Sequence, residues 1–261
     1  MGYIITICSQ KGGVAKTTTT LGLGGALAEQ GQRVLLVDLD PQGNLTLGLG
    51  LQPRQLQRTT ADLLLNAVPA RDILLPSAVE GLHILPANTT LQLAERYLPS
   101  RPNYQFALKR ALEPVLPDYD FILIDCPPSL SALSTNALTA AQLAILPTQA
   151  EYFSAYALKP MLQSLRMVRE RYNPQLTYLI LITMFRRRNR AHRIIRSRLE
   201  ATFGSGLCRT VIETDTKLRE AAIAGLPITH FAPRTRSAQQ YRALAQELIA
   251  HVQKEKATQT A

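Results

Sequence analysis

The sequence lacks several features that would direct the chain to a membrane or to an oxidising compartment. No apolar stretch approaches the roughly 20 residues that a membrane-spanning helix needs. Cysteine is scarce, and Cys8, Cys126 and Cys208 are widely spaced and odd in number. This spacing argues against disulfides and against a zinc site, so we expect reduced thiols in a cytoplasmic protein. The chain enters its first apolar segment at once, and we expect no signal peptide.

Acidic residues are also in short supply. The chain holds 29 Lys and Arg against 19 Asp and Glu, which gives a formal net charge of +10. Such an excess favours an anionic partner, either nucleic acid or a membrane surface. A diffuse basic surface that serves solubility is the alternative, and the location of the charges must decide between them.

Internal repeats, low-complexity linkers and breaks in composition are missing as well. We therefore expect one domain over residues 1–254, followed by a frayed tail at residues 255–261, where the apolar periodicity is lost. Strand-like and helix-like segments alternate, which predicts an α/β fold with a doubly wound, mostly parallel sheet and helices on both faces. The predicted strands cover residues 3–8, 33–38, 81–85, 120–125, 143–147, 176–183 and 207–212, and the predicted helices cover residues 17–30, 59–65, 103–112, 131–141, 154–172 and 189–203.

A glycine-rich loop lies between the first strand and the first helix. Its sequence, Gln-Lys-Gly-Gly-Val-Ala-Lys-Thr-Thr at residues 10–18, is a deviant Walker A motif of a P-loop NTPase, with Gln10 where the ordinary pattern has glycine. Lys16 is expected to contact the β- and γ-phosphates and Thr17 to ligate Mg²⁺. The second lysine, Lys11, comes too early for that task and is expected to contact the nucleotide of a second subunit. The remaining predicted phosphate-binding residues are Gly12, Gly13, Val14, Ala15 and Thr18.

Two further apolar segments end in aspartates. Residues 34–38 lead into Asp38 and Asp40, and residues 121–125 end at Asp125. The carboxyl ends of parallel strands face the crevice where α/β sheets bind ligands. We expect Asp40 to position the attacking water and lie in the metal shell, with Asp38 in support, and Asp125 to hold Mg²⁺ through water. The stiff Cys126–Pro128 turn is suited to a switch that senses the γ-phosphate.

A separate segment bears on whether the nucleotide carries adenine or guanine. Proteins that read guanine place an aspartate after an Asn/Thr-Lys-x sequence, whereas the segment Thr216–Arg219 ends in arginine. The sequence therefore favours ATP.

Residues 185–198 hold seven arginines and no acid. Ile194, Ile195 and Leu199 give the following helix an apolar side, and the arginines recur at three-residue steps. Residues 186–198 contain no Phe, Tyr or Trp that could stack bases, so contacts to duplex phosphates fit better than single-strand recognition. A solvated helix face is the alternative. The predicted DNA-binding residues are Arg186, Arg187, Arg188, Arg190, Arg193, Arg196, Lys217 and Arg219, and Arg234 and Arg236 add further positive charge downstream.

Taken together, the segments Lys11–Thr18, Asp38–Asn44 and Asp125–Ser129 resemble the ParA/MinD family of deviant-Walker ATPases, and most of all the short, Soj-type ParA partition proteins. The resemblance implies an ATP-dependent sandwich dimer that binds DNA without sequence preference and releases it after partner-stimulated hydrolysis. It also implies nucleoid association in the ATP-bound state, a stimulating ParB-like or small adaptor protein, and a chromosome, a plasmid or a protein body such as a carboxysome as cargo. The likeness extends through residues 60–64, 136–140, 147–153 and 181–185.

The sequence departs from this family at two places. Ala15 replaces the usual glycine, which costs roughly 1 kcal/mol if the backbone there needs a positive φ. Around Glu213 and Asp215 the family more often has proline followed by arginine near the adenine pocket. Met184, Glu213 and Asp215 are the predicted contacts to the nucleobase.

Three other functions are alternatives to this one. A MinD-like, membrane-cycling ATPase needs a free amphipathic C-terminal helix, and the apolar stripe from Tyr241 to Val252 is expected to pack on the body instead. We therefore expect no stable membrane association. An iron-protein-like reductase needs cysteines at a dimer axis, for which Cys126 and Cys208 are poorly placed. A nucleotide-binding scaffold without activity would not need Asp38, Asp40 and Asp125.

Overall fold

Aliphatic and β-branched residues form the strands of a seven-stranded sheet in a computed structural model that describes residues 2–260, apart from the side chains of residues 152–157 and 258–260. The strand order is β3-β4-β2-β5-β1-β6-β7, and only the short β3 pairs antiparallel to its neighbour. Every residue of β1, β2 and β5 is buried, as expected for strands covered on both faces. The strands are β1 (Tyr3–Ile7), β2 (Val34–Asp38), β3 (Leu75–Pro76), β4 (Leu82–Leu85), β5 (Phe121–Asp125), β6 (Leu143–Gln149) and β7 (Thr177–Thr183).

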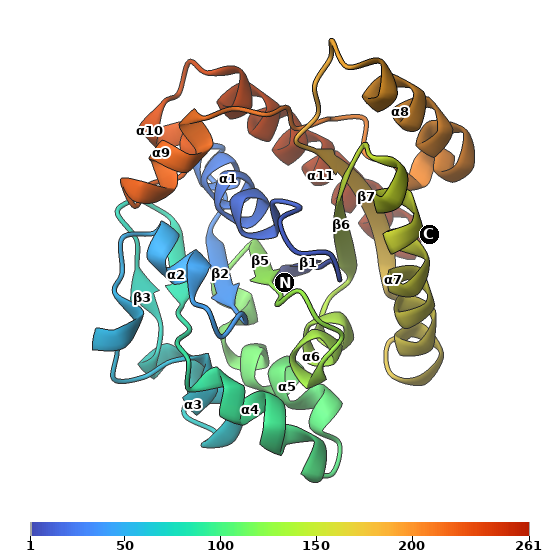
Figure 1. Cartoon of the computed structure of the whole chain (residues 1–261). Coiled ribbons are helices and arrows are strands. Elements are labelled where there is room, and N and C mark those ends of the chain that lie inside the picture. Colours follow the sequence, from blue (N-terminus) through green and yellow to red (C-terminus); the bar gives the residue numbers. More distant parts are fainter. Residues whose placement is uncertain (1, 261) are drawn as a thin grey trace.

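Helices cover both faces of this sheet, which confirms the predicted doubly wound α/β fold (Figure 1). One apolar core lies between the sheet and the helices α3 to α8, and the other lies between the sheet and the helices α1, α2 and α9 to α11. The helices are α1 (Lys16–Glu29), α2 (Asn44–Gly48), α3 (Thr60–Leu65), α4 (Leu91–Tyr97), α5 (Ala107–Leu112), α6 (Ala132–Ala140), α7 (Tyr152–Arg171), α8 (Arg190–Phe203), α9 (Lys217–Ile223), α10 (Ile228–Phe231) and α11 (Arg236–Thr260).

The strand predicted at residues 207–212 is wrong. Within this segment Leu207 alone makes a bridge, an isolated parallel one to Ile180, while Cys208 and Ile212 donate their N–H groups to the carbonyls of Ile180 and Ile182. The carboxylate of Glu247 accepts the backbone N–H groups of Arg209 and Thr210, at 2.7 and 2.9 Å. A side chain of α11 thus takes up backbone donors at this place, and the sheet ends at β7.

The last helix differs from the expected tail. Tyr241, Leu244 and Leu248 are fully buried, so the apolar stripe of α11 packs on the body, as predicted. The helix then continues through Thr260, where the sequence indicates fraying from residue 255. Glu255 accepts hydrogen bonds from the hydroxyl groups of Tyr3 and Thr177, which hold α11 against the amino ends of β1 and β7. The domain boundary at residue 254 stays a prediction.

Candidate functional site

The loop between β1 and α1 is shaped by two residues in the left-handed region. Gly13 has φ 71°, and Ala15, directly before the first residue of α1, has φ 63° and ψ 35°. An added Cβ at Gly12 or Gly13 would meet no atom within 4 Å, so the mouth of the loop is open. An open loop before a helix N-terminus is the arrangement that binds anions through backbone N–H groups, and the phosphate-binding role of these residues stays a prediction. Ala15 therefore occupies the conformation that favours the family's glycine.

Two of the three predicted metal-binding residues, Thr17 and Asp125, meet at the start of α1. The Thr17 hydroxyl donates to Asp125 Oδ2 at 2.6 Å, and the Thr20 hydroxyl donates to Asp125 Oδ1 at 3.3 Å. Lys16 is only 8% exposed, and its positive charge opposes the rise in the pKa of Asp125 that burial causes. Hydroxyl and carboxylate oxygens are the donors that Mg²⁺ prefers. The donor set thus fits a magnesium ion.

A second pair of aspartates lies beside this cluster. Asp38 is the strand partner of Asp125 in the parallel register of β2 and β5. The Asp38 carboxylate accepts the N–H of Asp40 at 3.1 Å and both the N–H and the hydroxyl of Thr46, at 2.9 and 2.7 Å. Asp38 therefore holds the loop that carries Asp40, and its role in supporting Asp40 during the reaction stays a prediction. Asp40 is 7% exposed and accepts the N–H of Gln42 at 2.9 Å.

Burial controls the ionisation of these acids. Desolvation raises the pKa of Asp125 to about 8, and the nearby Asp38 adds to the rise. Desolvation also raises the pKa of Asp38 to about 6, although the hydrogen bonds from Thr46 act against it. Because concentrated negative charge is costly here, the cluster favours a cation. In the described part of the chain, no three His, Cys, Asp or Glu side chains converge on one point, so phosphate oxygens and water would have to complete a magnesium shell.

Lys11 contacts residues of its own chain. Its amine donates to Gln149 Oε1 at 2.8 Å and lies 3.3 Å from Glu151 Oε2. Gln149 also donates to the Gly13 carbonyl at 3.3 Å and contacts the Met184 sulfur at 3.0 Å. Gln149 is not among the predicted site residues. Its position at the carboxyl end of β6, beside β1, is the signal that could have found it.

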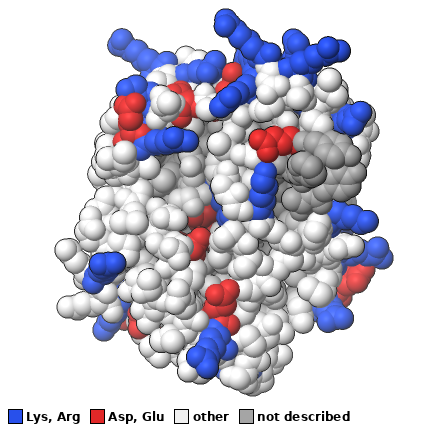
Figure 2. Space-filling view, viewed as in Figure 1, with Lys and Arg blue, Asp and Glu red and all other residues white. Residues whose placement is uncertain are grey.

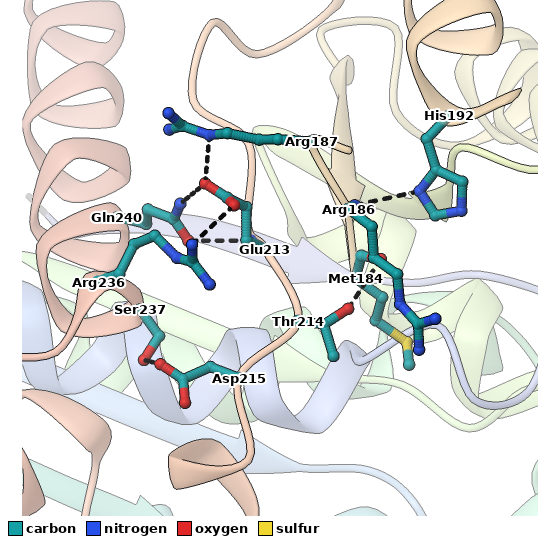
Figure 3. A network of polar contacts seen from close by, with 10 residues as sticks. All are labelled: Met184, Arg186, Arg187, His192, Glu213, Thr214, Asp215, Arg236, Ser237 and Gln240. Atoms are coloured by element: carbon teal, nitrogen blue, oxygen red, sulfur yellow. Dashed lines mark hydrogen bonds and ion pairs between the residues drawn. The ribbon is translucent and has the colours of Figure 1, made fainter. Parts of the chain in front are cut away.

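The predicted nucleobase contacts lie together where β7 leaves the sheet. Met184 has φ 53°, and its carbonyl accepts the Thr214 hydroxyl at 3.1 Å. The Asp215 carboxylate accepts from Ser237 at 2.8 Å. The Glu213 carboxylate is only 5% exposed and is directed at Arg187 and at residues of α11 (Figure 3). The fold therefore engages both acids in internal contacts, and their role toward a base stays a prediction.

The predicted DNA-binding residues lie on one side of the molecule. Figure 2 shows Lys and Arg side chains gathered along the top of the view, where α8 and α9 lie in Figure 1. Ile195 and Leu199 bury the inner side of α8, whereas Ile194 is 46% exposed and does not belong to the predicted apolar side. Lys217 and Arg219 come from α9 rather than α8. We call the exposed arginines Arg186, Arg187, Arg188, Arg190 and Arg193, with the half-buried Arg196, the arginine surface.

A cleft of 740 Å³ adjoins the arginine surface between α8 and α11. Arg187, Arg193, Arg196 and Arg209 line it together with Glu200 and Glu213. Arg196 pairs with Glu200 at 2.7 Å, and its guanidinium lies 5.9 Å from the centre of the Phe185 ring. The buried His192, also on α8, accepts the N–H of Arg186 at 3.2 Å and fixes the turn that presents the arginines. None of the helices in the described residues has both the length and the apolar character to cross a bilayer.

Known proteins match almost the whole chain. A family profile described as an AAA domain matches residues 2–178. The sporulation initiation inhibitor protein Soj of Bacillus subtilis is 41% identical over 96% of this chain and 100% of its own. The chromosome partitioning protein ParA of Myxococcus xanthus is 38% identical over 95% of this chain and 88% of its own.

A solved structure agrees with these relatives. It was described as a cobyrinic acid a,c-diamide synthase of Mycobacterium smegmatis with a bound ATP analog and magnesium. It is 36% identical, covers 97% of this chain and 96% of its own, and has a TM-score of 0.84. These likenesses agree with the loop that carries Lys11 and Lys16 and with the hydrogen bond between Thr17 and Asp125. The chain belongs to the ParA/MinD family of deviant-Walker P-loop ATPases.

Proposed function

We propose that this protein is a ParA-type ATPase that uses ATP and Mg²⁺ to form a sandwich dimer, binds DNA without sequence preference and positions or segregates a cargo. The observation that carries the proposal is the hydrogen bond from Thr17 to Asp125 beside the buried Lys16, in a chain that also presents the arginine surface. The relatives named Soj and ParA support a partitioning role. A ParB-like or small adaptor protein would stimulate hydrolysis, and the cargo would be a chromosome, a plasmid or a protein body such as a carboxysome.

The residues of the loop divide the chemistry among them. The N–H groups of Gly12 and Gly13 and the N-terminus of α1 would bind the phosphates, and Lys16 would contact the β- and γ-phosphates. Thr17 and Asp125 would hold Mg²⁺, which supplies charge neutralisation on the transferred phosphoryl group. Asp40, on the loop that Asp38 holds, would orient the attacking water.

The arginine surface would make DNA binding dependent on the dimer. One protomer that neutralises about four phosphates gives a log–log salt slope of roughly −3.6, and two aligned protomers give about −7. Doubling the number of phosphate contacts in this way turns marginal binding into useful binding at physiological salt. Because arginine forks contact phosphates rather than base edges, affinity should hardly vary between unrelated duplexes. ATP-bound protein would then be associated with the nucleoid in the cytoplasm.

DNA binding across a salt series, with ATP and with ADP, tests this function. The Asp40→Ala protein is expected to bind ATP without hydrolysing it, to dimerise in light scattering with ATP but not ADP, and to bind DNA steeply only with ATP. Lys16→Ala serves as the control that binds no ATP, and Lys11→Ala is expected to bind ATP without dimerising. Equal DNA affinity with both nucleotides would rule out the switch, and full hydrolysis by Asp40→Ala would remove Asp40 from the mechanism.

The membrane-cycling alternative makes a different prediction. Because α11 buries Tyr241, Leu244 and Leu248, it would have to leave the body to offer this apolar stripe to a bilayer. The protein with ATP should therefore stay with the soluble fraction in liposome flotation. Flotation with ATP and not with ADP would favour the alternative.

A further inference from the structure

One buried carboxylate joins two arginines from distant parts of the sequence. Glu213 accepts from Arg187 Nε at 2.8 Å through Oε1, and Arg236 Nη1 lies 3.2 Å from Oε2 (Figure 3). Arg187 belongs to the turn after β7, whereas Arg236 is the first residue of α11. A single glutamate therefore holds the turn and the helix start together on the side of the molecule that carries the arginine surface.

A glutamine fixes the position of this carboxylate. Gln240, one turn further along α11, donates to Glu213 Oε1 at 2.8 Å and accepts the N–H of Glu213 at 2.9 Å. The Glu213 side chain is 5% exposed, so its charge is compensated by the arginines and by Gln240 rather than by water. A carboxylate held in this way has one orientation, and its partners are held with it.

The two arginines keep their outer faces toward solvent. Their side chains are 75% and 56% exposed for Arg187 and Arg236. Arg187 contacts Glu213 through Nε, which leaves its two terminal nitrogens directed away from the carboxylate. The cluster of one glutamate and two arginines carries a net charge of +1. Guanidinium forks fixed in this orientation match phosphate oxygens and lose little side-chain entropy on binding.

We propose that Arg236 is a further DNA-binding residue, and that Glu213 is the positioning residue that sets Arg187 and Arg236 as one unit against the phosphodiester backbone. The proposal rests on the DNA binding proposed above and extends that surface from the β7–α8 turn to α11. The cleft lined by Arg187, Arg193 and Glu213 places the unit beside the arginines of α8. Glu213 then acts on DNA rather than on the nucleobase.

Substitution of Arg236 tests the new contact. Removing one phosphate contact per protomer should reduce the salt slope of an ATP-bound dimer by about 1.8, which is about 30-fold weaker binding at 0.15 M salt if both lines meet near 1 M. Arg33→Ala is the matched control, because Arg33 is also 56% exposed and paired with an aspartate at 2.9 Å. It lies next to the amino end of β2, away from the carboxyl end of β7 that Glu213 adjoins, and it should leave the slope unchanged.

Substitution of Glu213 tests the positioning role, because simple electrostatics predicts the opposite sign. Removing a negative charge near DNA should strengthen binding if Glu213 only repels phosphate. If Glu213 positions the arginines, Glu213→Ala should instead weaken binding and flatten the slope. Glu213→Gln keeps an oxygen that accepts from Arg187 and should restore much of the loss.

Three readouts keep the outcomes apart. Light scattering with ATP and thermal unfolding show whether each variant still dimerises and folds. An Arg236→Ala protein that dimerises and binds DNA like Arg33→Ala, or a Glu213→Ala protein that binds more tightly, would overturn the proposal while DNA binding by the parent protein still stands. A parent protein without ATP-dependent DNA binding would refute both proposals.

Discussion

Ala15 should be a source of strain that a single substitution relieves. It has φ 63° and ψ 35°, where a side-chain Cβ costs roughly 1–2 kcal/mol and glycine pays no such penalty. Glycine also makes the unfolded chain more flexible, which offsets about 0.4–1 kcal/mol. We expect Ala15→Gly to raise the free energy of unfolding by about 0.5–1 kcal/mol. For 261 residues the unfolding entropy is about 0.55 kcal/mol/K, so Tm should rise by about 1–2 °C.

Gly13 provides the reciprocal control. Its φ is 71°, and an added Cβ would meet no atom within 4 Å, so Gly13→Ala changes backbone strain without a steric clash. It should lower stability by about as much as Ala15→Gly raises it. Urea unfolding without nucleotide, with both variants and the double variant, measures the difference. An Ala15→Gly protein no more stable than the parent, or a harmless Gly13→Ala, would refute the assignment of strain to these positions.

Two further predictions concern the buried acids and the packing of α1. Burial raises the pKa of Asp125, which lies beside Asp38, Asp40 and Lys16, to about 8. The folded protein therefore holds the proton of this carboxyl group more tightly than the unfolded chain does. The metal-free protein should lose stability from this group as pH rises from about 4 to about 8. Asp125→Asn should remove that component when unfolding is compared at pH 5 and 8 in EDTA; an unchanged pH dependence contradicts it. Gly25→Ala would place a Cβ 2.3 Å from Pro227 Cβ and should cost about 1–3 kcal/mol in urea unfolding, whereas Gly12→Ala, in open space, should stay within about 0.5 kcal/mol.

The arrangement of the predicted phosphate site could be read from the sequence because it depends on local signals and one topological rule. The strand, the glycine loop and the helix are contiguous, and Asp125 reaches Thr17 because the carboxyl ends of neighbouring parallel strands meet at one edge of the sheet. The six longer strands were predicted on the same grounds of apolar continuity.

The features that sequence reasoning missed depend on contacts between distant segments. The segment 207–212 has the composition of a strand, but Glu247, about 40 residues away, accepts the backbone N–H groups of Arg209 and Thr210. The pairing of Glu213 with Arg236 likewise depends on where α11 begins to pack. The two-residue β3 is too short for any periodicity to indicate it.

Lys11 contacts residues of its own chain in the monomer and would contact the second nucleotide in the proposed dimer. In the single chain its amine contacts Gln149 and Glu151, and the Lys11 and Glu151 side chains are 34% and 52% exposed. An ion pair this open to solvent contributes about 0–1 kcal/mol. Two triphosphates brought face to face repel far more strongly, because each carries several charges at short range. The contact with Glu151 therefore holds Lys11 at the mouth of the loop without opposing its transfer to a second nucleotide, and the proposed dimer gains more from the lysine than the single chain loses.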